Sequence, residues 1–151
     1  VTPGGRVVTL ELNSAFAEVA RSNVAIAGLA EGVEVRVGPA LETLALLTAE
    51  TSGPFDFIFI DADKESMAEY FRWALKLSRR GSLIVVDNVV REGTLIDEER
   101  RDAHIRGIRD FYALAAAEPR VSMTAIQTVG TKGYDGFAVA LVVADAPNSS
   151  C

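Results

Sequence analysis

The sequence predicts an α/β fold whose sheet is mostly parallel and ends in an antiparallel hairpin. Short apolar runs rich in β-branched residues alternate with longer segments of helical periodicity, which is typical of a parallel sheet with crossover helices. The last two strand-like runs, residues 121–129 and 137–143, have no helix between them and should therefore pair antiparallel. With 151 residues, the chain has the length of one domain and can bury a substantial core.

The first fifty residues contain two expected strands, each followed by a helix. The segment Arg6–Leu12 is a strand candidate with Glu11 near its carboxyl end, and residues 33–37 alternate between apolar and charged, which indicates a strand near a sheet edge. Asn13 or Ser14 can cap the helix after the first strand, and Gly28 can end it. We expect strands at 6–12 and 33–37 and helices at 14–27 and 41–49.

A central apolar run is followed directly by charged residues. The run Phe57–Ile60 follows Gly53-Pro54 and is too short for a helix, so we expect a strand buried on both faces. It ends in Asp61-Ala62-Asp63-Lys64. The carboxyl end of a parallel strand is where open α/β sheets bind their ligands, so this segment is the first candidate for a functional site.

The remaining elements continue the same alternation. Apolar residues at helical spacing between Met67 and Leu75 predict an amphipathic helix, with basic residues in its last turn and Gly81 closing it. The next strand, residues 82–86, also ends in polar residues, Asp87 and Asn88. A polar loop at 89–97, a helix at 98–117 and the two hairpin strands complete the domain.

Composition excludes several classes of protein. The net charge is −6 and no basic block is present, which disfavours nucleic acid as a partner. The single cysteine, Cys151, can form neither a disulfide framework nor a thiolate metal site. No apolar stretch approaches the length of a membrane span and no signal peptide is visible, so we expect a cytoplasmic protein.

Asp61, Asp87 and Asn88 are candidate metal ligands. Adjacent strands lie about 4.8 Å apart, so carboxylates at two neighbouring strand ends can share one small cation. Carboxylate and amide oxygens suit Mg²⁺, whereas zinc sites are usually built from Cys and His. Either aspartate alone is better interpreted as a loop or helix cap, but the combination with Lys64 favours a metal site.

Three further candidates have alternative interpretations. Lys64 could act as a general base, since a nearby cation and burial both disfavour the ammonium form, but it could equally be a solvated lysine at a helix start. Asp63 could bind a ligand or cap the following helix. Glu11 lies where nucleotide-binding folds hold ribose hydroxyls, although one acidic residue at a strand end is weak evidence.

Together these motifs resemble those of the metal-dependent O-methyltransferases, the family of caffeoyl-coenzyme A and catechol O-methyltransferases and their bacterial relatives. The resemblance extends from about residue 5 to residue 143 and is carried by Gly38-Pro-Ala-Leu41, Asp61-Ala-Asp-Lys64, Asp87-Asn88 and Asp135-Gly136. It implies a Rossmann-like, S-adenosylmethionine (AdoMet)-dependent methyltransferase sheet. It also implies that AdoMet is the methyl donor.

The resemblance assigns a role to each residue of the predicted metal site. It implies that a vicinal-dihydroxy aromatic acceptor binds through both oxygens to Mg²⁺, or to another divalent cation, held by Asp61, Asp87 and Asn88. Lys64 is then the catalytic residue that takes the phenolic proton. Alignment of oxygen, methyl carbon and sulfonium sulfur would complete the mechanism.

For the donor site, the resemblance implies that Glu11 holds the ribose and that Ala40 and Asp63 line the pocket. We expect the whole protein to be a homodimer that acts on a small aromatic hydroxyl compound and binds no membrane.

The sequence departs from the family pattern at its start. Family members begin with helices that cover the acceptor, then a central strand and a glycine-rich turn at the donor, whereas residues 1–5 here correspond to the turn before the second strand. We therefore expect residues 1–143 to be a methyltransferase domain that is incomplete at its N-terminus, followed by a tail at 144–151. The strands at 6–12 and 57–60 would each lack a neighbour unless they paired with each other, and these residues alone should be inactive.

Other functions remain open. A nicotinamide-dependent oxidoreductase would also use Glu11, but it would leave Asp61, Lys64, Asp87 and Asn88 without a purpose. An inactive nucleoside-binding module of the same fold, or a methyltransferase of a hydroxylated tRNA base, are the alternatives within the family.

Overall fold

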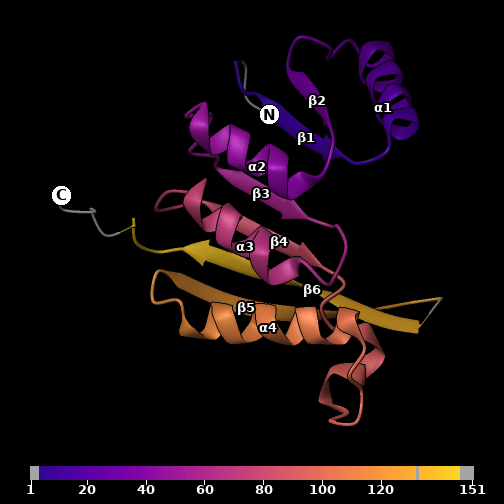
Figure 1. Cartoon of the computed structure of the whole chain (residues 1–151), viewed down its shortest axis with the longest axis vertical. Coiled ribbons are helices and arrows are strands. Elements are labelled where there is room, and N and C mark those ends of the chain that lie inside the picture. The colour runs from indigo at the N-terminus through magenta and orange to yellow at the C-terminus, as the bar shows by residue number, and fades with distance from the viewer. Residues whose placement is uncertain (1–3, 132, 147–151) are drawn as a thin grey trace. The chain divides into compact units, whose positions relative to one another are not determined.

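The structure is a computed structural model that describes residues 4–131 and 133–146. The chain forms two compact units that divide between Glu50 and Thr51. Figure 1 shows strands and helices alternating along most of the chain, with a hairpin at the end. The predicted α/β class with its C-terminal antiparallel hairpin is confirmed.

The first unit is a parallel βαβ arrangement followed by a second helix. Strand β1 pairs in parallel with β2, with Val7 opposite Val33 and Glu11 opposite Val37. The side chain of Asn13 accepts hydrogen bonds from the backbone N–H groups of Ala15 and Phe16, so the predicted N-cap is confirmed. The elements are β1 (Val7–Glu11), α1 (Ser14–Ile26), β2 (Val33–Val37) and α2 (Ala40–Ala49).

The second unit contains a four-stranded sheet in the order β3-β4-β6-β5. Strands β3 and β4 are parallel, whereas β6 runs antiparallel to both β4 and β5. The loop after β4 contains a short helical segment, η1, that is kinked at Glu92 and Gly93. The elements are β3 (Phe57–Ile60), α3 (Met67–Lys76), β4 (Leu83–Asp87), η1 (Arg91–Ile96), α4 (Ala103–Ala117), β5 (Val121–Gly130) and β6 (Gly133–Val142).

The core of the second unit lies between one face of this sheet and helices α3 and α4, which lie beside each other on that face (Figure 1). Phe71 of α3 and Phe111 of α4 are fully buried and meet edge to face, with ring centroids 5.1 Å apart. The sheet contributes buried Ile84 and Val86 from β4 and small alanines from β6. This packing fixes α3 and α4 relative to the carboxyl ends of β3 and β4.

The prediction that Phe57–Ile60 is buried on both faces is wrong. Ile60 is buried against the helices, but Phe57 and Phe59 are 57% and 56% exposed. Successive strand residues point to opposite faces, and α3 and α4 both cover the face that carries Ile60. Leu83 lies opposite Phe57 on the neighbouring strand β4, and Leu141 of β6 lies opposite Leu83. Leu141 is also exposed, so this other face of the sheet is open at both positions.

Several predicted boundaries also differ. Helix α4 begins at Ala103 and not at residue 98, because the Asp102 carboxylate accepts a hydrogen bond from the Ile105 N–H and caps the helix there. Helix α3 ends at Lys76, before the two arginines expected in its last turn. Strand β6 begins at Gly133, four residues earlier than expected. Most of the predicted tail, including Cys151, lies outside the described residues.

Strands β1 and β3 do not pair with each other. Among the described strands, β1 pairs with β2 alone and β3 pairs with β4 alone.

None of the helices that the structure describes is both long and apolar enough to span a bilayer.

Candidate functional site

The candidate site of the second unit is built on the carboxyl ends of β3 and β4. Ile60 lies opposite Val86 in the parallel register, so the next residues along the two strands are Asp61 and Asp87. The charged pair therefore lies at neighbouring strand ends, as the sequence predicted. The Asp61 side chain is half exposed, so this edge of the sheet is accessible.

Lys64 joins the two strand ends. Its Nζ donates hydrogen bonds to Asp61 Oδ1 at 3.1 Å and to the backbone oxygen of Asp87 at 3.2 Å. The Lys64 side chain is only 10% exposed. The interpretation of Lys64 as a solvated helix-start lysine is therefore wrong, because the side chain turns inward to the Asp61 carboxylate and the Asp87 backbone oxygen.

Asn88 follows at the point where the chain leaves β4. Its φ is +58°, in the left-handed region that asparagine tolerates better than most residues. Its backbone N–H donates to Asp87 Oδ1 at 2.8 Å. The sharp turn thus begins directly after the second carboxylate.

The donor set is chemically suited to a hard divalent cation. Asp61 uses one carboxylate oxygen for Lys64 and Asp87 uses one for the Asn88 N–H, and no described residue hydrogen-bonds to the second oxygen of either. Across residues 4–131 and 133–146, no group of three or more His, Cys, Asp and Glu side chains could hold a metal. Asp61 and Asp87 are only two such residues, and with the amide oxygen of Asn88 they would form an oxygen-only donor set, which is typical of Mg²⁺ sites and not of zinc sites.

Asp63 is not the N-cap of the following helix, because that position is Ser66, and Asp63 binds the turn before it. Its Oδ1 accepts a hydrogen bond from the Ser66 N–H at 2.9 Å, and its Oδ2 accepts one from the Tyr70 hydroxyl. Burial raises the pKa of Asp63, but these hydrogen bonds outweigh burial and leave the pKa below its usual value. Burial and the Asp63 hydrogen bond together raise the pKa of Tyr70 to about 12.

Two further residues support the site and were missed by sequence reasoning. Gly107 of α4 lies against the backbone of Lys64 and Glu65, where any side chain would collide. A glycine in a helix interior is unfavourable by about 1 kcal/mol relative to alanine. The presence of this glycine inside a helical pattern is the only feature of the sequence that indicates the close approach.

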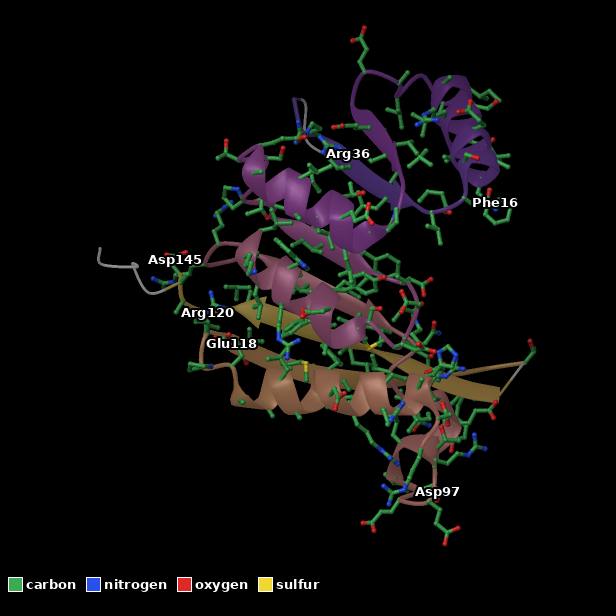
Figure 2. The ribbon with its side chains drawn as sticks, viewed as in Figure 1. Phe16, Arg36, Asp97, Glu118, Arg120 and Asp145 are labelled. Atoms are coloured by element: carbon green, nitrogen blue, oxygen red, sulfur yellow. The ribbon has the colours of Figure 1, made fainter. Side chains whose placement is uncertain are left out.

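Arg109 donates to the carbonyl oxygen of Leu95 at 3.0 Å and to that of Asp97 at 2.6 Å, and Asp97 lies at the far end of the loop after β4 (Figure 2).

The two predicted donor-site residues of the first unit also lie together at a sheet edge. Glu11 is the last residue of β1, and Ala40 begins α2 shortly after the end of β2. The Gly38 N–H donates to the Glu11 backbone oxygen at 3.0 Å, which ties the two strand ends together. Glu11 Oε1 accepts a hydrogen bond from the Asn13 N–H at 2.7 Å, and the N-cap of α2, Pro39, provides no side-chain cap.

Comparison with known proteins identifies the family. The sequence model of the O-methyltransferase family matches residues 1–141. The chain belongs to the O-methyltransferase family. The resemblance inferred from the motifs at the strand ends is thus confirmed.

Relatives and solved structures agree with this assignment. A catechol O-methyltransferase of Niastella koreensis is 49% identical over 138 residues, which are 91% of this chain and 62% of the relative. A catechol O-methyltransferase of Mycobacterium tuberculosis is 54% identical over 140 residues, which are 93% of this chain and 62% of the relative.

The chain therefore spans 62% of the length of these two curated relatives. The crystal structure of the O-methyltransferase from Bacillus cereus in complex with SAH is similar with a TM-score of 0.89 and 60% identity, covering 92% of this chain and 63% of that one. The O-methyltransferase TomG from Streptomyces achromogenes, in complex with SAM, matches with a TM-score of 0.91 and 50% identity, covering 95% of this chain and 64% of that one.

Proposed function

We propose that the whole protein transfers a methyl group from AdoMet to one hydroxyl of a catechol-like aromatic compound, with a divalent cation, Mg²⁺ in the simplest case, at Asp61, Asp87 and Asn88. The observation that carries the proposal is the meeting of Asp61, Asp87 and Lys64 at two adjacent strand ends in a chain of the O-methyltransferase family. Two relatives named catechol O-methyltransferase support the substrate class, and solved relatives with SAH or SAM support the donor.

In this proposal, the two carboxylates and the amide of Asn88 hold the cation. Bound there, the cation would lower the pKa of an acceptor hydroxyl and fix the acceptor by both of its vicinal oxygens. The second oxygens of Asp61 and Asp87, which accept no hydrogen bond from described residues, supply the charged ligands. Their charge also compensates for the cation in a partly buried site.

Lys64 would take the acceptor's proton. In its neutral form Nζ has a lone pair, and its two hydrogen bonds hold that nitrogen beside both strand ends. The deprotonated oxygen would then attack the methyl carbon as the carbon–sulfur bond of the donor breaks, which would leave S-adenosylhomocysteine. Because Lys64 is largely buried, its position is set by packing and not by solvent, which favours a defined geometry for proton transfer.

Glu11, Ala40 and Asp63 would bind the donor. A carboxylate at the end of β1 suits the two hydroxyls of a ribose, and the first backbone N–H groups of α2, which no side chain of the N-cap residue caps, suit an acceptor atom of the nucleoside. Asp63 is kept ionised by Ser66 and Tyr70, so it would present a fixed negative charge to the positively charged donor.

The experiment that tests the proposal measures methyl transfer from labelled AdoMet to catechol by the whole protein, with Mg²⁺ and with a chelator. We expect turnover with Mg²⁺, loss of turnover with the chelator, and loss of calorimetric Mg²⁺ binding in Asp87→Ala. Glu69→Gln is the matched control, because Glu69 forms an exposed ion pair with Arg72. Turnover that persists in the chelator would contradict the metal site while leaving the family assignment intact.

A further inference from the structure

The loop that follows β4 has an unusual backbone. Three of its non-glycine residues have positive φ values, +58° at Asn88, +49° at Arg91 and +52° at Glu92, and Gly93 has +76°. Such conformations are uncommon outside glycine and persist only when the surrounding structure holds them. The loop begins with Asn88, the third proposed metal ligand, so whatever holds it also sets the position of that ligand.

Asp135 of β6 binds the first part of this loop directly, while Tyr112 and Tyr134 donate to the backbone oxygens of Val89 and Glu92. A single carboxylate oxygen of Asp135, Oδ1, accepts hydrogen bonds from the backbone N–H groups of Val90 at 3.0 Å, Arg91 at 2.8 Å and Gly136 at 2.9 Å. The other oxygen lies 3.7 Å from the Arg91 guanidinium. Burial raises the pKa of Asp135, but the three backbone donors and Arg91 outweigh it, so the pKa is lowered and the carboxylate stays ionised.

Gly136, the next residue of β6, adds a further hydrogen bond between β6 and the loop. The Val89 N–H donates to the Gly136 backbone oxygen at 3.0 Å, and the Val89 side chain is fully buried. A Cβ at Gly136 would lie 2.6 Å from Val90 Cγ2 and would also collide with the backbone oxygen of Ile126. Residue 136 must therefore be glycine for β6 to approach the loop this closely, which brings the Asp135 carboxylate within reach of the loop's N–H groups.

We infer that Asp135 is a positioning residue that fixes the backbone of residues 88–91 and thereby presents the Asn88 carboxamide to a cation bound by Asp61 and Asp87. The inference rests on the proposed function. Asn88 lies between two carboxylate anchors, since its own N–H is bound by Asp87 and the N–H two residues later is bound by Asp135. Asp135 acts through the backbone and not as a ligand, because its Oδ1 already accepts three hydrogen bonds and its Oδ2 faces Arg91.

The test compares Asp135→Ala, Asp135→Asn and the control Asp102→Ala in the whole protein. Asp102 is a matched control because it also accepts a backbone N–H, that of Ile105, but it caps α4 and is hydrogen-bonded to none of the described residues of the proposed site. Three quantities are measured: Mg²⁺ affinity by calorimetry, S-adenosylhomocysteine affinity, and amide hydrogen exchange of residues 88–93.

We expect Asp135→Ala to weaken Mg²⁺ binding by about 10–100-fold, the usual effect of removing a residue that orients metal ligands. Exchange at Val90 and Arg91 should be faster, while S-adenosylhomocysteine affinity should be unchanged. Asp135→Asn keeps one oxygen acceptor, so its loss of Mg²⁺ affinity should be smaller. It is also the deciding variant if Asp135→Ala fails to fold. Asp102→Ala should keep the Mg²⁺ affinity of the unaltered protein.

The outcomes are distinguishable. If the unaltered protein binds no Mg²⁺, the proposed metal site is refuted and the inference falls with it. If Mg²⁺ binds and the Asp135 variants bind it as tightly, the inference is overturned and the proposed function stands. An equal loss of Mg²⁺ affinity in Asp102→Ala would show that general destabilisation, and not the position of Asn88, causes the effect.

Discussion

Gly107 of α4 lies directly against the turn that carries Lys64. A Cβ at this residue would collide with the Lys64 backbone oxygen and would lie 2.8 Å from that of Glu65 and 2.9 Å from the Glu65 Cα. All of these are backbone atoms, so no change of side-chain rotamer relieves the collision. Gly107→Ala should therefore move either the helix or the turn.

The sign of its effect on stability follows from two opposing contributions. Alanine in place of glycine normally stabilises a helix interior by about 1 kcal/mol. Inserting a methyl group into a packed region costs about 1–3 kcal/mol, and rigid backbone neighbours place this site in the upper part of that range. The free energy of unfolding should thus fall by about 1–2 kcal/mol, opposite in sign to the helix propensity.

Urea unfolding of the whole protein measures this difference. His104→Ala is the control on the same helix, because His104 is exposed and its substitution should change the free energy of unfolding by at most about 0.5 kcal/mol. Methyl transfer should also slow in Gly107→Ala, since the turn positions Lys64. A Gly107→Ala protein as stable as the unaltered one would refute the reasoning, because the close approach would then impose no constraint.

Three other predictions concern the ligands and pH. Glu11→Ala should weaken S-adenosylhomocysteine binding by about 1.5–3 kcal/mol, the usual worth of a charged hydrogen bond; an equal loss of Mg²⁺ affinity would show that Glu11 is misplaced in the donor site. Lys64→Ala should lower turnover by about 10²–10⁴-fold with donor and metal affinities nearly intact, and Lys64→Arg should not restore it, because guanidinium stays protonated; near-normal rates in Lys64→Arg would mean that a fixed positive charge suffices. The pKa of Asp63 is lowered in the folded protein, so its contribution to stability is present above the unfolded value of about 3.9 and is lost as the pH falls through the folded value. Asp63→Asn should therefore reduce the acid sensitivity of thermal unfolding, and an identical pH dependence in the variant would contradict this.

The sequence was sufficient to predict the strand ends of the site. Asp61 and Asp87 each follow an apolar run too short for a helix, and parallel strands bring their carboxyl ends to the same edge. The cap of α1 at Asn13 was predictable for a similar reason, because the cap residue and the N–H groups it binds are neighbours in sequence. Local periodicity and the chemistry of the flanking residues carry this information.

The burial of β3 could not be predicted in the same way. An apolar run such as Phe57–Ile60 has the same pattern whether one or both faces are covered, and coverage depends on segments distant in sequence. The start of α4 was ambiguous for a different reason. Asp97 and Asp102 both accept backbone N–H groups at helix-like spacing, and only the fold shows that the continuous helix begins at the second.

The residues that hold the backbone of the site lie far from its proposed ligands in the sequence. Asp135 binds the N–H of Val90 across 45 residues, and Gly107 contacts the turn at Lys64 through α4. The strands place the carboxylates, but α4 and β6 fix the backbone that carries Lys64 and Asn88. Grafting the predicted ligands onto another parallel sheet would therefore reproduce the charges without the geometry, because the loop after β4 would have no Asp135 to hold its left-handed residues.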